Sequence, residues 1–335
     1  MIFITVGIIC KNEEKYIGNL IKSLKKLDFD KSCYGIIVVD GNSTDSTVKI
    51  IKRNLRGSKI KHLILNEKDF GGGGHCFARN LVIRKAFKNS QYIAFVDADC
   101  IVRTDWLKKL YKKIENTNRK IAGVGGPRSV ANTEDAMEKV INTYLTTFVG
   151  SGGNLAFWKG KRKYIHSIAN YNAMYRYSIL KRFKYDESLV NCDDIDINYR
   201  ITKSGYRFLY APEAGVLHAE TGSLVKFMKK MFNYGRAAMK TSLKNHAVVR
   251  ISIIAGILSV PLIPILFLSM LILPKFIITK SLVSLYVGLT TITFLDISNK
   301  TRVPQSLLVY ILPIVQHMSY GLGNLYQLLT TQTKS

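Results

Sequence analysis

The stretch Ile93-Ala-Phe-Val-Asp-Ala-Asp-Cys100 places two carboxylates directly after a short apolar run. The run reads as a buried strand, so Asp97 and Asp99 fall at its carboxyl end. Two acids at positions i and i+2 can face one divalent cation. Their hard oxygen ligands suit Mg²⁺ or Mn²⁺, which can bridge a diphosphate. Chance and helix capping also produce this pattern, so its meaning depends on the surrounding chain.

Three further runs rich in β-branched residues precede this strand: Ile2–Cys10, Tyr34–Asp40 and His62–Leu65. Helical patterns alternate with the strands and cover Glu13–Leu27, Phe77–Phe87 and Thr104–Ile114. A further helix carries Val48, Ile51 and Leu55, and either Ser43 or Thr44 can cap it. The alternation predicts an α/β fold, with a mostly parallel sheet covered by helices on both faces. Such sheets bind ligands at the carboxyl ends of their strands, where Glu13, Asp40, Asp97 and Asp99 are expected.

A second acidic cluster, Asp193-Asp194-Ile195-Asp196, follows Cys192. Three acids in four residues repel one another unless they meet cations or share a proton. A solvated helix N-terminus, where the helix dipole favours acids, would explain the cluster. The functional alternative is a carboxylate general base that takes a proton from an acceptor hydroxyl.

A run of four glycines, residues 71–74, precedes His75 and then Ala78-Arg79-Asn80. Glycines let the backbone approach a ligand, and Arg79 can pair with phosphate; a flexible surface loop is the alternative. No Gly-Lys-Ser/Thr follows, and no G-x-G-x-x-G follows the first strand, so neither a P-loop nor a dinucleotide fingerprint is present. His218 is either a metal ligand or a buried histidine.

Charge is divided unevenly along the 335 residues. The formal net charge of +26 requires an anionic partner such as nucleic acid, a membrane surface or a phosphorylated substrate. Residues 251–335 hold five of the 49 Lys/Arg and one of the 23 Asp/Glu. This separation of a basic body from an apolar tail, and the lack of an aromatic-basic RNA motif, argue against nucleic acid. The five scattered cysteines lack a CxxC pair and fit a reducing compartment.

The tail contains three apolar stretches. Ile251–Pro274 is a run of 24 residues without a charge, and as a helix it would reach about 36 Å against about 30 Å of bilayer hydrocarbon. Val303–Thr333 is another, of 31 residues. Phe276–Leu295 is interrupted only by Lys280, which can snorkel. We therefore expect two to three transmembrane spans over residues 249–331, with a buried helical core as the alternative.

The topology follows from the flanking charges. Ile2–Cys10 has no basic region before it and is too short to span, so no secretory signal is expected. The positive-inside rule places the loop with Lys300 and Arg302 in the cytoplasm. We expect a multi-pass protein of the cell membrane with its polar body in the cytoplasm. Pro261 and Pro264 would also allow a re-entrant hairpin in the first stretch.

Several weak motifs occur in an order that resembles the family 2 inverting glycosyltransferases. They are Ile8-Ile-Cys-Lys-Asn-Glu-Glu14, Val38-Val-Asp-Gly-Asn-Ser-Thr-Asp-Ser-Thr47, Phe95-Val-Asp-Ala-Asp99 and Asp193-Asp-Ile-Asp-Ile-Asn-Tyr-Arg200, joined by Asn172–Arg176, Tyr185–Glu187 and Gly205–Glu213. The resemblance covers residues 3–222. It implies a GT-A catalytic domain over residues 1–222 and metal-dependent, inverting transfer from a UDP- or GDP-linked sugar.

The resemblance also implies roles for the donor side. Glu13 and Asp40 would hold the nucleotide base, and Arg79 would lie near the donor phosphates. Asp97 would contact the ribose or the donor sugar. Asp99 would ligate Mg²⁺ or Mn²⁺, and His218 matches a histidine that completes the metal shell in many relatives.

For the catalytic base, the resemblance points to the second acid of a Glu-Asp pair, which is Asp194 here. The first acid is Asp193 rather than Glu, and its shorter side chain leaves the base assignment open between the two. Asp194 is our choice. It would deprotonate the acceptor hydroxyl as that oxygen attacks the anomeric carbon from the face opposite the leaving group.

Residues 223–248 interleave lysines and arginines with apolar side chains just before the first span. Such a basic amphipathic helix is attracted to an anionic cytoplasmic leaflet, although a solvated helix face is the alternative. Tyr234-Gly235-Arg236 sits where polymerising relatives carry an Arg/Trp gating motif, which makes Arg236 a candidate donor-binding residue. No Gln-x-x-Arg-Trp string is present, so processive polysaccharide synthesis is the less favoured reading.

We expect a single sugar to be added to a hydroxyl or phosphate of a lipid or lipid-linked glycan, because such an acceptor explains the apolar tail. A non-catalytic, membrane-anchored nucleotide-sugar-binding protein is the alternative from a different class. The acids at positions 97, 99 and 194 argue against it.

Overall fold

The computed structural model describes residues 1–130, 134–151, 164–189, 193–219, 222–244, 251–272 and 277–332. The chain forms two compact units. The first contains all the strands and the helices packed on them. The second is helical and contains α5 (Ala136–Thr146), α6 (Phe148–Ser151) and the C-terminal helices.

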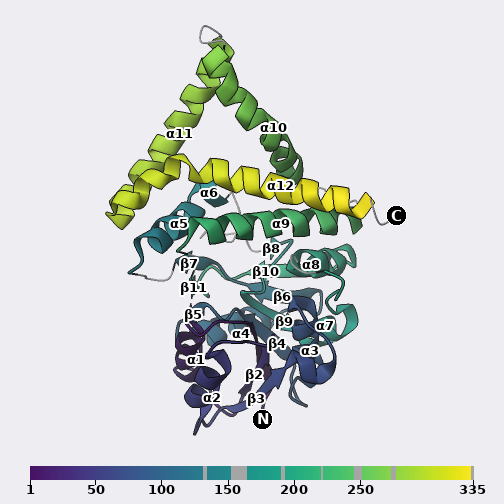
Figure 1. Ribbon diagram of the computed structural model, residues 1–335. Helices are drawn as coiled ribbons and strands as arrows, with labels where there is room; N and C mark the ends of the chain where they lie inside the picture. The colour runs from purple at the N-terminus through teal and green to yellow at the C-terminus, as the bar shows by residue number, and fades with distance from the viewer. Residues whose placement is uncertain are drawn as a thin grey trace. The chain divides into compact units, whose positions relative to one another are not determined.

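The first unit is built on an eight-stranded mixed sheet of order β3-β2-β1-β4-β9-β6-β10-β8 (Figure 1). Six strands share one direction, whereas β9 and β8 run antiparallel to their neighbours. The strands are β1 (Ile4–Cys10), β2 (Tyr34–Asp40), β3 (Lys61–Asn66), β4 (Tyr92–Val96), β6 (Ile121–Gly125), β8 (Tyr164–Ile165), β9 (Asn172–Arg176) and β10 (Arg207–Tyr210). The α/β expectation is confirmed, and the two reversed strands make the sheet mixed.

Helices cover both faces of the sheet because the buried strands alternate their apolar side chains between two cores. Ile36 and Val38 of β2 pack in the core that contains α1 (Ile17–Lys25), α2 (Thr47–Leu55) and α4 (Trp106–Ile114). Ile37 and Val39 pack in the opposite core, with α3 (His75–Lys85), α7 (Tyr177–Phe183) and α8 (Asp193–Lys203). The two-faced covering predicted from the strand–helix alternation is therefore present.

The second helix is not capped by Ser43 or Thr44, although its sequence predicts such a cap. Helix α2 begins at Thr47 and follows Ser46, whose side chain makes no capping hydrogen bond. The Ser43 hydroxyl instead donates to Oδ1 of Asp40 at 2.6 Å. Ser43 is therefore used by the strand end, where the buried carboxylate needs donors, rather than by the helix.

A small second sheet lies beside the main one and has the order β5-β11-β7. Its strands are β5 (Cys100–Val102), β11 (Val216–His218) and β7 (Arg128–Val130). The strand β5 comes directly after Asp99, and β11 pairs antiparallel with it. This pairing joins two sequence regions more than a hundred residues apart.

The second unit is organised around α12 (Leu312–Gln332), which packs along α9 (Leu224–Lys244) and crosses α10 (Ile251–Ile272) (Figure 1). Glycines allow the close approach. A Cβ at Gly323 would overlap the carbonyl oxygen of Phe232 on α9, and one at Gly321 would overlap that of Gly256 on α10. The helix α11 (Ile277–Thr301) and the 3-10 helix η4 (Pro304–Tyr310) complete the unit.

Two helices of this unit are long and apolar enough to cross a membrane. Their apolar windows are Ser252–Ser269, with a mean hydropathy of 2.2, and Lys280–Thr301, with 1.4. Most of each window is exposed, being only 11% and 17% buried, which is expected of side chains that face lipid. The third apolar run, Val303–Thr333, is divided between η4 and α12. Within the described residues it gives no further span candidate.

Candidate active site

Asp99 and His218 face each other beside the small sheet. Strand pairing sets His218 opposite Cys100, and His218 Nε2 lies 3.5 Å from Oδ1 of Asp99. His218 Nδ1 lies 2.6 Å from the carbonyl oxygen of Ala219. Because a carbonyl only accepts, Nδ1 carries the proton in the neutral ring, and the Nε2 lone pair is directed to the Asp99 side. Both predicted metal ligands are thus brought together.

The donor set at this position suits a divalent cation such as Mn²⁺ or Mg²⁺. The ligand atoms of Asp99, Cys100 and His218 lie within 4.8 Å of one another. Burial raises the pKa of the Cys100 thiol well above its usual value, and the charges of Asp99 and Asp97 raise it further. Mn²⁺ and Mg²⁺ favour oxygen and nitrogen ligands over sulfur, so the carboxylate of Asp99 and the Nε2 nitrogen of His218 are the better-matched donors.

Arg79 is a buried cation at the same edge of the sheet. Its side chain projects from α3, and Nη2 lies 3.6 Å from Oδ1 of Asp97, which directly follows β4. Arg79 is only 5% exposed, and its guanidinium carbon lies 6.0 Å from the ring centre of Phe95 and 5.8 Å from that of Tyr185. The ion pair and the aromatic contacts hold a permanent positive charge beside Asp97, where it can meet a phosphate group.

Asp40 lies at the carboxyl end of β2, in register with Cys10 on one side and Asn66 on the other. Its side chain is buried and accepts hydrogen bonds from the Ser43 amide at 3.0 Å, the Ser43 hydroxyl at 2.6 Å and Asn66 Nδ2 at 3.3 Å. These donors stabilise the charged carboxylate and orient it at the strand edge.

Glu13 follows β1 at the same edge and is half-buried. Its backbone amide donates to Thr47 Oγ1 at 2.7 Å, which ties the loop after β1 to the start of α2. Glu13 and Asp40 thus lie on neighbouring strand ends, as the sequence predicts. Their contact with a nucleotide base stays a prediction.

Glu67, which sequence reasoning missed, orders the glycine-rich loop. It is buried at the start of η1 (Glu67–Phe70), and its Oε2 accepts the amide of Gly74 at 3.1 Å. Gly74 has φ +97°, a conformation that glycine adopts readily, and α3 with Arg79 begins at the next residue. Burial raises the pKa of Glu67, although the Gly74 amide and the charge of Lys11 lower it. The sequence signal that could have identified Glu67 is an acid at the end of a strand, which is the signal that identified Asp40.

Asp194 lies in the first turn of α8, where its Oδ1 accepts the amide of Ile195 at 2.9 Å, and Tyr171 lies beside the metal-ligand pair. The Tyr171 ring meets the His218 ring edge-on, with centroids 5.6 Å apart. Burial raises the pKa of the Tyr171 phenol, Arg128 lowers it, and the charge of Asp194 raises it further. Asp193 begins α8, and its side chain lies outside the described residues.

The third acid of this cluster has a structural task. Asp196 is fully buried, and its Oδ2 accepts from Arg200 Nη2 at 2.7 Å and from Nε at 2.9 Å. The same guanidinium donates to the carbonyl oxygen of Phe183 at 2.6 Å. The Asp196–Arg200 pair therefore anchors α8 to the end of α7, which is neither of the two roles predicted for the cluster.

Tyr171 and Arg128 were also missed. The guanidinium carbon of Arg128, on β7, lies 5.5 Å from the ring centre of Tyr171. No local pattern distinguishes either residue, because only the pairing of β7 with β11 brings Arg128 near His218.

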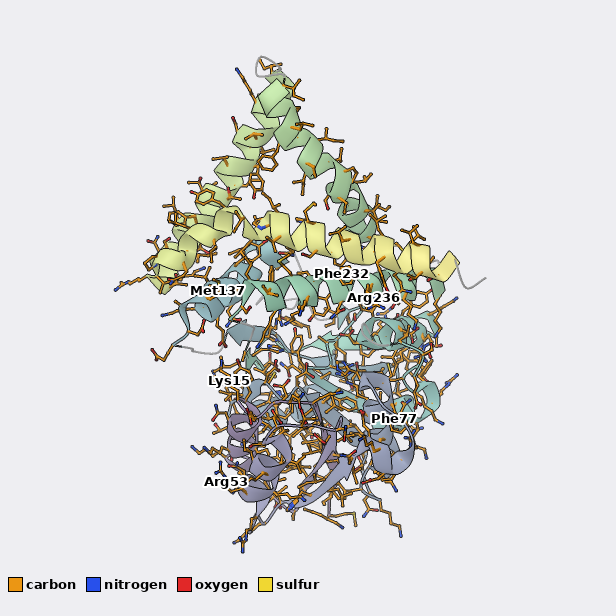
Figure 2. The ribbon with its side chains drawn as sticks, in the orientation of Figure 1. Lys15, Arg53, Phe77, Met137, Phe232 and Arg236 are labelled. Carbon is orange, nitrogen blue, oxygen red and sulfur yellow. The ribbon has the colours of Figure 1, made fainter. Side chains whose placement is uncertain are left out.

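Arg236 belongs to the second unit. Figure 2 labels it on α9 together with Phe232. Its guanidinium carbon lies 4.9 Å from the ring centre of Tyr326 on α12, and the Phe232 ring contacts the same tyrosine at 5.8 Å. Arg236 thus packs at the junction of α9 with α12. Its proposed part in donor binding stays a prediction.

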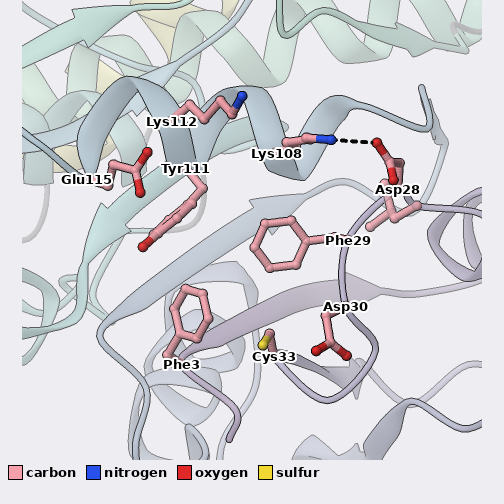
Figure 3. A pocket seen from close by; sticks show the side chains of 10 residues that line it. Phe3, Asp28, Phe29, Asp30, Cys33, Lys108, Tyr111, Lys112 and Glu115 are labelled. Atoms are coloured by element: carbon pink, nitrogen blue, oxygen red, sulfur yellow. Dashed lines mark hydrogen bonds and ion pairs between the residues drawn. The ribbon is translucent and has the colours of Figure 1, made fainter.

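Two hollows in the first unit lie away from these carboxylates. The one in Figure 3, of about 560 Å³, is lined by the aromatic rings of Phe3, Phe29 and Tyr111 near the amino ends of β1 and β2. The other, of about 840 Å³, includes Tyr92 at the start of β4 and Arg176 at the end of the antiparallel β9. Neither shares a residue with the predicted site, so size alone does not locate the chemistry here.

Comparison with known proteins identifies the class. Residues 5–184 match the model of glycosyl transferase family 2, which is more than half of the chain. The chain therefore belongs to this family, and the resemblance seen in its motifs is confirmed. It is a glycosyltransferase.

Particular relatives refine this picture. The chain is 28% identical over 332 residues to a dolichyl N-acetyl-alpha-D-glucosaminyl phosphate 3-beta-D-2,3-diacetamido-2,3-dideoxy-beta-D-glucuronosyltransferase of Methanococcus voltae, with 96% of each chain covered. It is 27% identical over 245 residues to an uncharacterized glycosyltransferase of Methanocaldococcus jannaschii, covering 69% of this chain and 76% of that one.

A solved structure has the same fold. The mannosyltransferase PcManGT from Pyrobaculum calidifontis, in complex with GDP-Man and Mn²⁺, superposes with a TM-score of 0.65 over 96% of this chain and 87% of its own. At 14% identity this likeness shows the fold alone, and that fold is GT-A-like.

Proposed function

We propose that this protein transfers one sugar from a nucleotide-sugar donor to a lipid-linked acceptor, with inversion at the anomeric carbon and with help from a divalent cation. The observation that carries the proposal is the meeting of Asp97 with Arg79 and of Asp99 with His218 at the carboxyl edge of the sheet. The acceptor class is suggested by the Methanococcus voltae relative, whose name specifies a dolichyl-phosphate-linked sugar as acceptor.

For the donor, Asp40 and Glu13 would bind the nucleotide base at the ends of β2 and β1. Arg79 would offset the charge of the diphosphate, and Asp97 would contact the ribose or the sugar. The buried position of Arg79 supports this role, because a cation shielded from water interacts strongly with an arriving anion. Arg236 would add a donor contact from the second unit.

For the metal, Asp99 and His218 would hold Mn²⁺ or Mg²⁺. The bound ion would supply a Lewis acid that stabilises the negative charge of the departing nucleoside diphosphate. The protonated Nδ1 of His218 is held by the Ala219 carbonyl, which keeps Nε2 available as a ligand.

For the base, Asp194 would take the proton of the acceptor hydroxyl, with Asp193 as the neighbouring acid. The acceptor oxygen forms a bond to the anomeric carbon while the bond from that carbon to the phosphate oxygen breaks. The proton remains on the carboxylate and the electron pair leaves with the nucleoside diphosphate. One displacement from the opposite face inverts the configuration, and no covalent glycosyl-enzyme is formed.

For location, we propose that α10 and α11 anchor the protein as a multi-pass component of the cell membrane, with residues 1–222 in the cytoplasm. Residues 223–248 would lie against the anionic leaflet and residues 249–331 would contain the spans. Exposed Lys226 and Lys229 on α9, beside exposed Val225 and Met228, support this arrangement.

The test is a transfer assay with the full-length protein, a panel of UDP- and GDP-sugars, Mn²⁺ or Mg²⁺, and dolichyl-phosphate-linked N-acetylglucosamine as acceptor. We expect Asp194→Asn to lower turnover by about 10³-fold or more while the affinity for UDP or GDP stays unchanged. Asp28→Asn removes an exposed acid between α1 and β2, where it pairs with Lys108, so it is a matched control and should retain activity. Wild-type turnover in Asp194→Asn would remove Asp194 from this role, and binding without any transfer by the wild type would favour a non-catalytic binder.

A further inference from the structure

A buried hydrogen-bond network lies between the donor side and the base side of the site. At its centre, Oδ1 of Asn170 accepts the hydroxyl of Tyr185 at 2.9 Å and that of Tyr175 at 3.2 Å. All three side chains are at least 95% buried. Buried polar groups are costly unless they are satisfied, so these contacts define the relative placement of the elements that carry them.

Asn198 connects this centre to α8. Its Oδ1 lies 3.1 Å from the Tyr175 hydroxyl, whose single proton is shared between Asn198 and Asn170. Its Nδ2 donates to the carbonyl oxygen of Ile168 at 2.6 Å and to the Ser167 hydroxyl at 2.9 Å. Asn198 itself is fully buried. Asn198 is four positions after Asp194, so the two lie on the same face of α8, one turn apart.

Asn80 connects the other side to α3. Its Nδ2 donates to the carbonyl oxygen of Tyr185 at 2.9 Å and to Glu187 Oε1 at 2.8 Å, and its Oδ1 accepts the Tyr185 amide at 2.9 Å. The preceding residue is Arg79, whose guanidinium lies over the Tyr185 ring. The backbone that supports the phosphate-facing cation is thus bonded to the same tyrosine that donates to Asn170.

The network also includes hydrogen bonds to the residues just before Tyr171. Asn170 directly precedes Tyr171 in the chain. Ile168, whose carbonyl oxygen accepts from Asn198, is three positions before Tyr171. Tyr171 contacts His218, a predicted metal ligand. The same set of hydrogen bonds is therefore linked to three parts of the proposed machinery. Arg79 is next to Asn80 in the chain, Tyr171 beside Asn170 contacts His218, and Asp194 is one helical turn before Asn198.

We propose that Asn198 and Asn170 are positioning residues, which set the base Asp194 relative to the donor and the metal ligands. This inference rests on the proposed function. An apolar core could hold α8 against the sheet, but directional hydrogen bonds define the register of the helix as well. A displacement of the base by about 1 Å costs on the order of 100-fold in rate, so the register of α8 matters to catalysis.

The test compares Asn198→Leu with Thr5→Val in the full-length protein. Thr5 is fully buried in the same unit and its hydroxyl bonds Ser90 at 2.6 Å, at the opposite edge of the sheet. Both changes remove buried hydrogen bonds, so both should lower the thermal midpoint. We expect Asn198→Leu alone to lower kcat by about 10- to 100-fold, with the KM for the donor within about twofold of wild type. Equal kcat values in the two variants would overturn the proposal.

A second pair keeps the proposal testable if Asn198→Leu does not fold. Asn170→Asp retains an acceptor for both tyrosine hydroxyls, whereas Asn170→Leu removes it. We expect Asn170→Asp to keep most of the wild-type kcat and Asn170→Leu to lose it, and equal losses would contradict the inference. If the wild type transfers no sugar from the panel, the proposed function fails instead. Hydrogen exchange then tests the network alone, because α8 amides should exchange faster in Asn198→Leu than in Thr5→Val.

Discussion

At the scale of single residues, the acids of the site differ in what their surroundings provide. Asp40 accepts hydrogen bonds from Ser43 and Asn66, Asp97 faces a buried arginine, and Asp99 faces a histidine with a defined tautomer. Glu67 differs from these, because desolvation is the largest influence on it. Burial therefore raises the pKa of the Glu67 carboxyl.

This difference predicts the pH dependence of a Glu67→Gln variant. The pKa of Glu67 is raised in the folded state, so between its unfolded and folded values the native protein binds more protons. Its contribution to stability therefore falls as pH rises through that window. Gln has no titrating proton and can still accept the Gly74 amide. We expect the thermal midpoint of the variant, minus that of wild type, to be more positive at pH 7 than at pH 4.

Asp69→Asn is the matched control, because Asp69 is an exposed acid two residues further along η1. Its midpoint difference from wild type should not change with pH in the same direction. A Glu67→Gln difference that is constant from pH 4 to pH 7 would mean that burial does not penalise the charged form of this side chain.

The site residues that could be predicted from the sequence share one property. Asp40, Asp97 and Asp99 directly follow apolar runs, so a strand pattern alone locates them at the sheet edge. Arg128 could not be found in this way, because its place depends on β7 pairing with β11 about ninety residues later. Tyr171 could not be found either, because its partner His218 lies 47 residues further along the chain. Non-local pairings of this kind leave no periodic signal in either partner.

At the scale of elements, the buried parallel strands were the most predictable. The expected run Tyr34–Asp40 coincides with β2, and the apolar run that precedes Asp97 falls within β4, because strands covered on both faces are continuously apolar. The reversed strand β9 was not predicted. This strand is the sequence Asn172-Ala-Met-Tyr-Arg176, which has a polar residue at each end. Its direction is set by pairing with β4 and β6 rather than by its composition.

The helices of the second unit depend on glycine contacts that can be tested one at a time. A Cβ at Gly323 would overlap the Phe232 carbonyl, so Gly323→Ala should force α12 away from α9 and lower the thermal midpoint. Gly288 in α11 has no atom within 4 Å of its would-be Cβ. Gly288→Ala should therefore be neutral or add about 0.5–1 kcal/mol through helix propensity. Equal midpoints for the two variants, measured in detergent, would show that α9 and α12 do not pack through Gly323.

At the scale of the whole molecule, the chain combines a basic catalytic unit with helices whose apolar side chains are exposed. Residues 1–250 hold 44 of the 49 basic residues, and the two long apolar windows belong to the second unit. A lipid-linked acceptor is confined to a surface, so an enzyme held at that surface meets it at a high effective concentration. Charge and hydropathy together therefore bear on substrate access as well as on location.

This arrangement predicts that anionic lipid increases the transfer rate through α9. Lys226 and Lys229 are exposed on that helix, and each lysine near an anionic leaflet contributes about 1 kcal/mol of attraction. In nanodiscs that contain phosphatidylglycerol, wild type should transfer faster than in phosphatidylcholine alone. The double variant Lys226→Gln, Lys229→Gln should lose most of that advantage. The variant Lys52→Gln, Arg53→Gln removes the same charge from exposed positions on α2 and should keep it. If both double variants lose the advantage equally, the attraction comes from net charge and α9 has no special part in it.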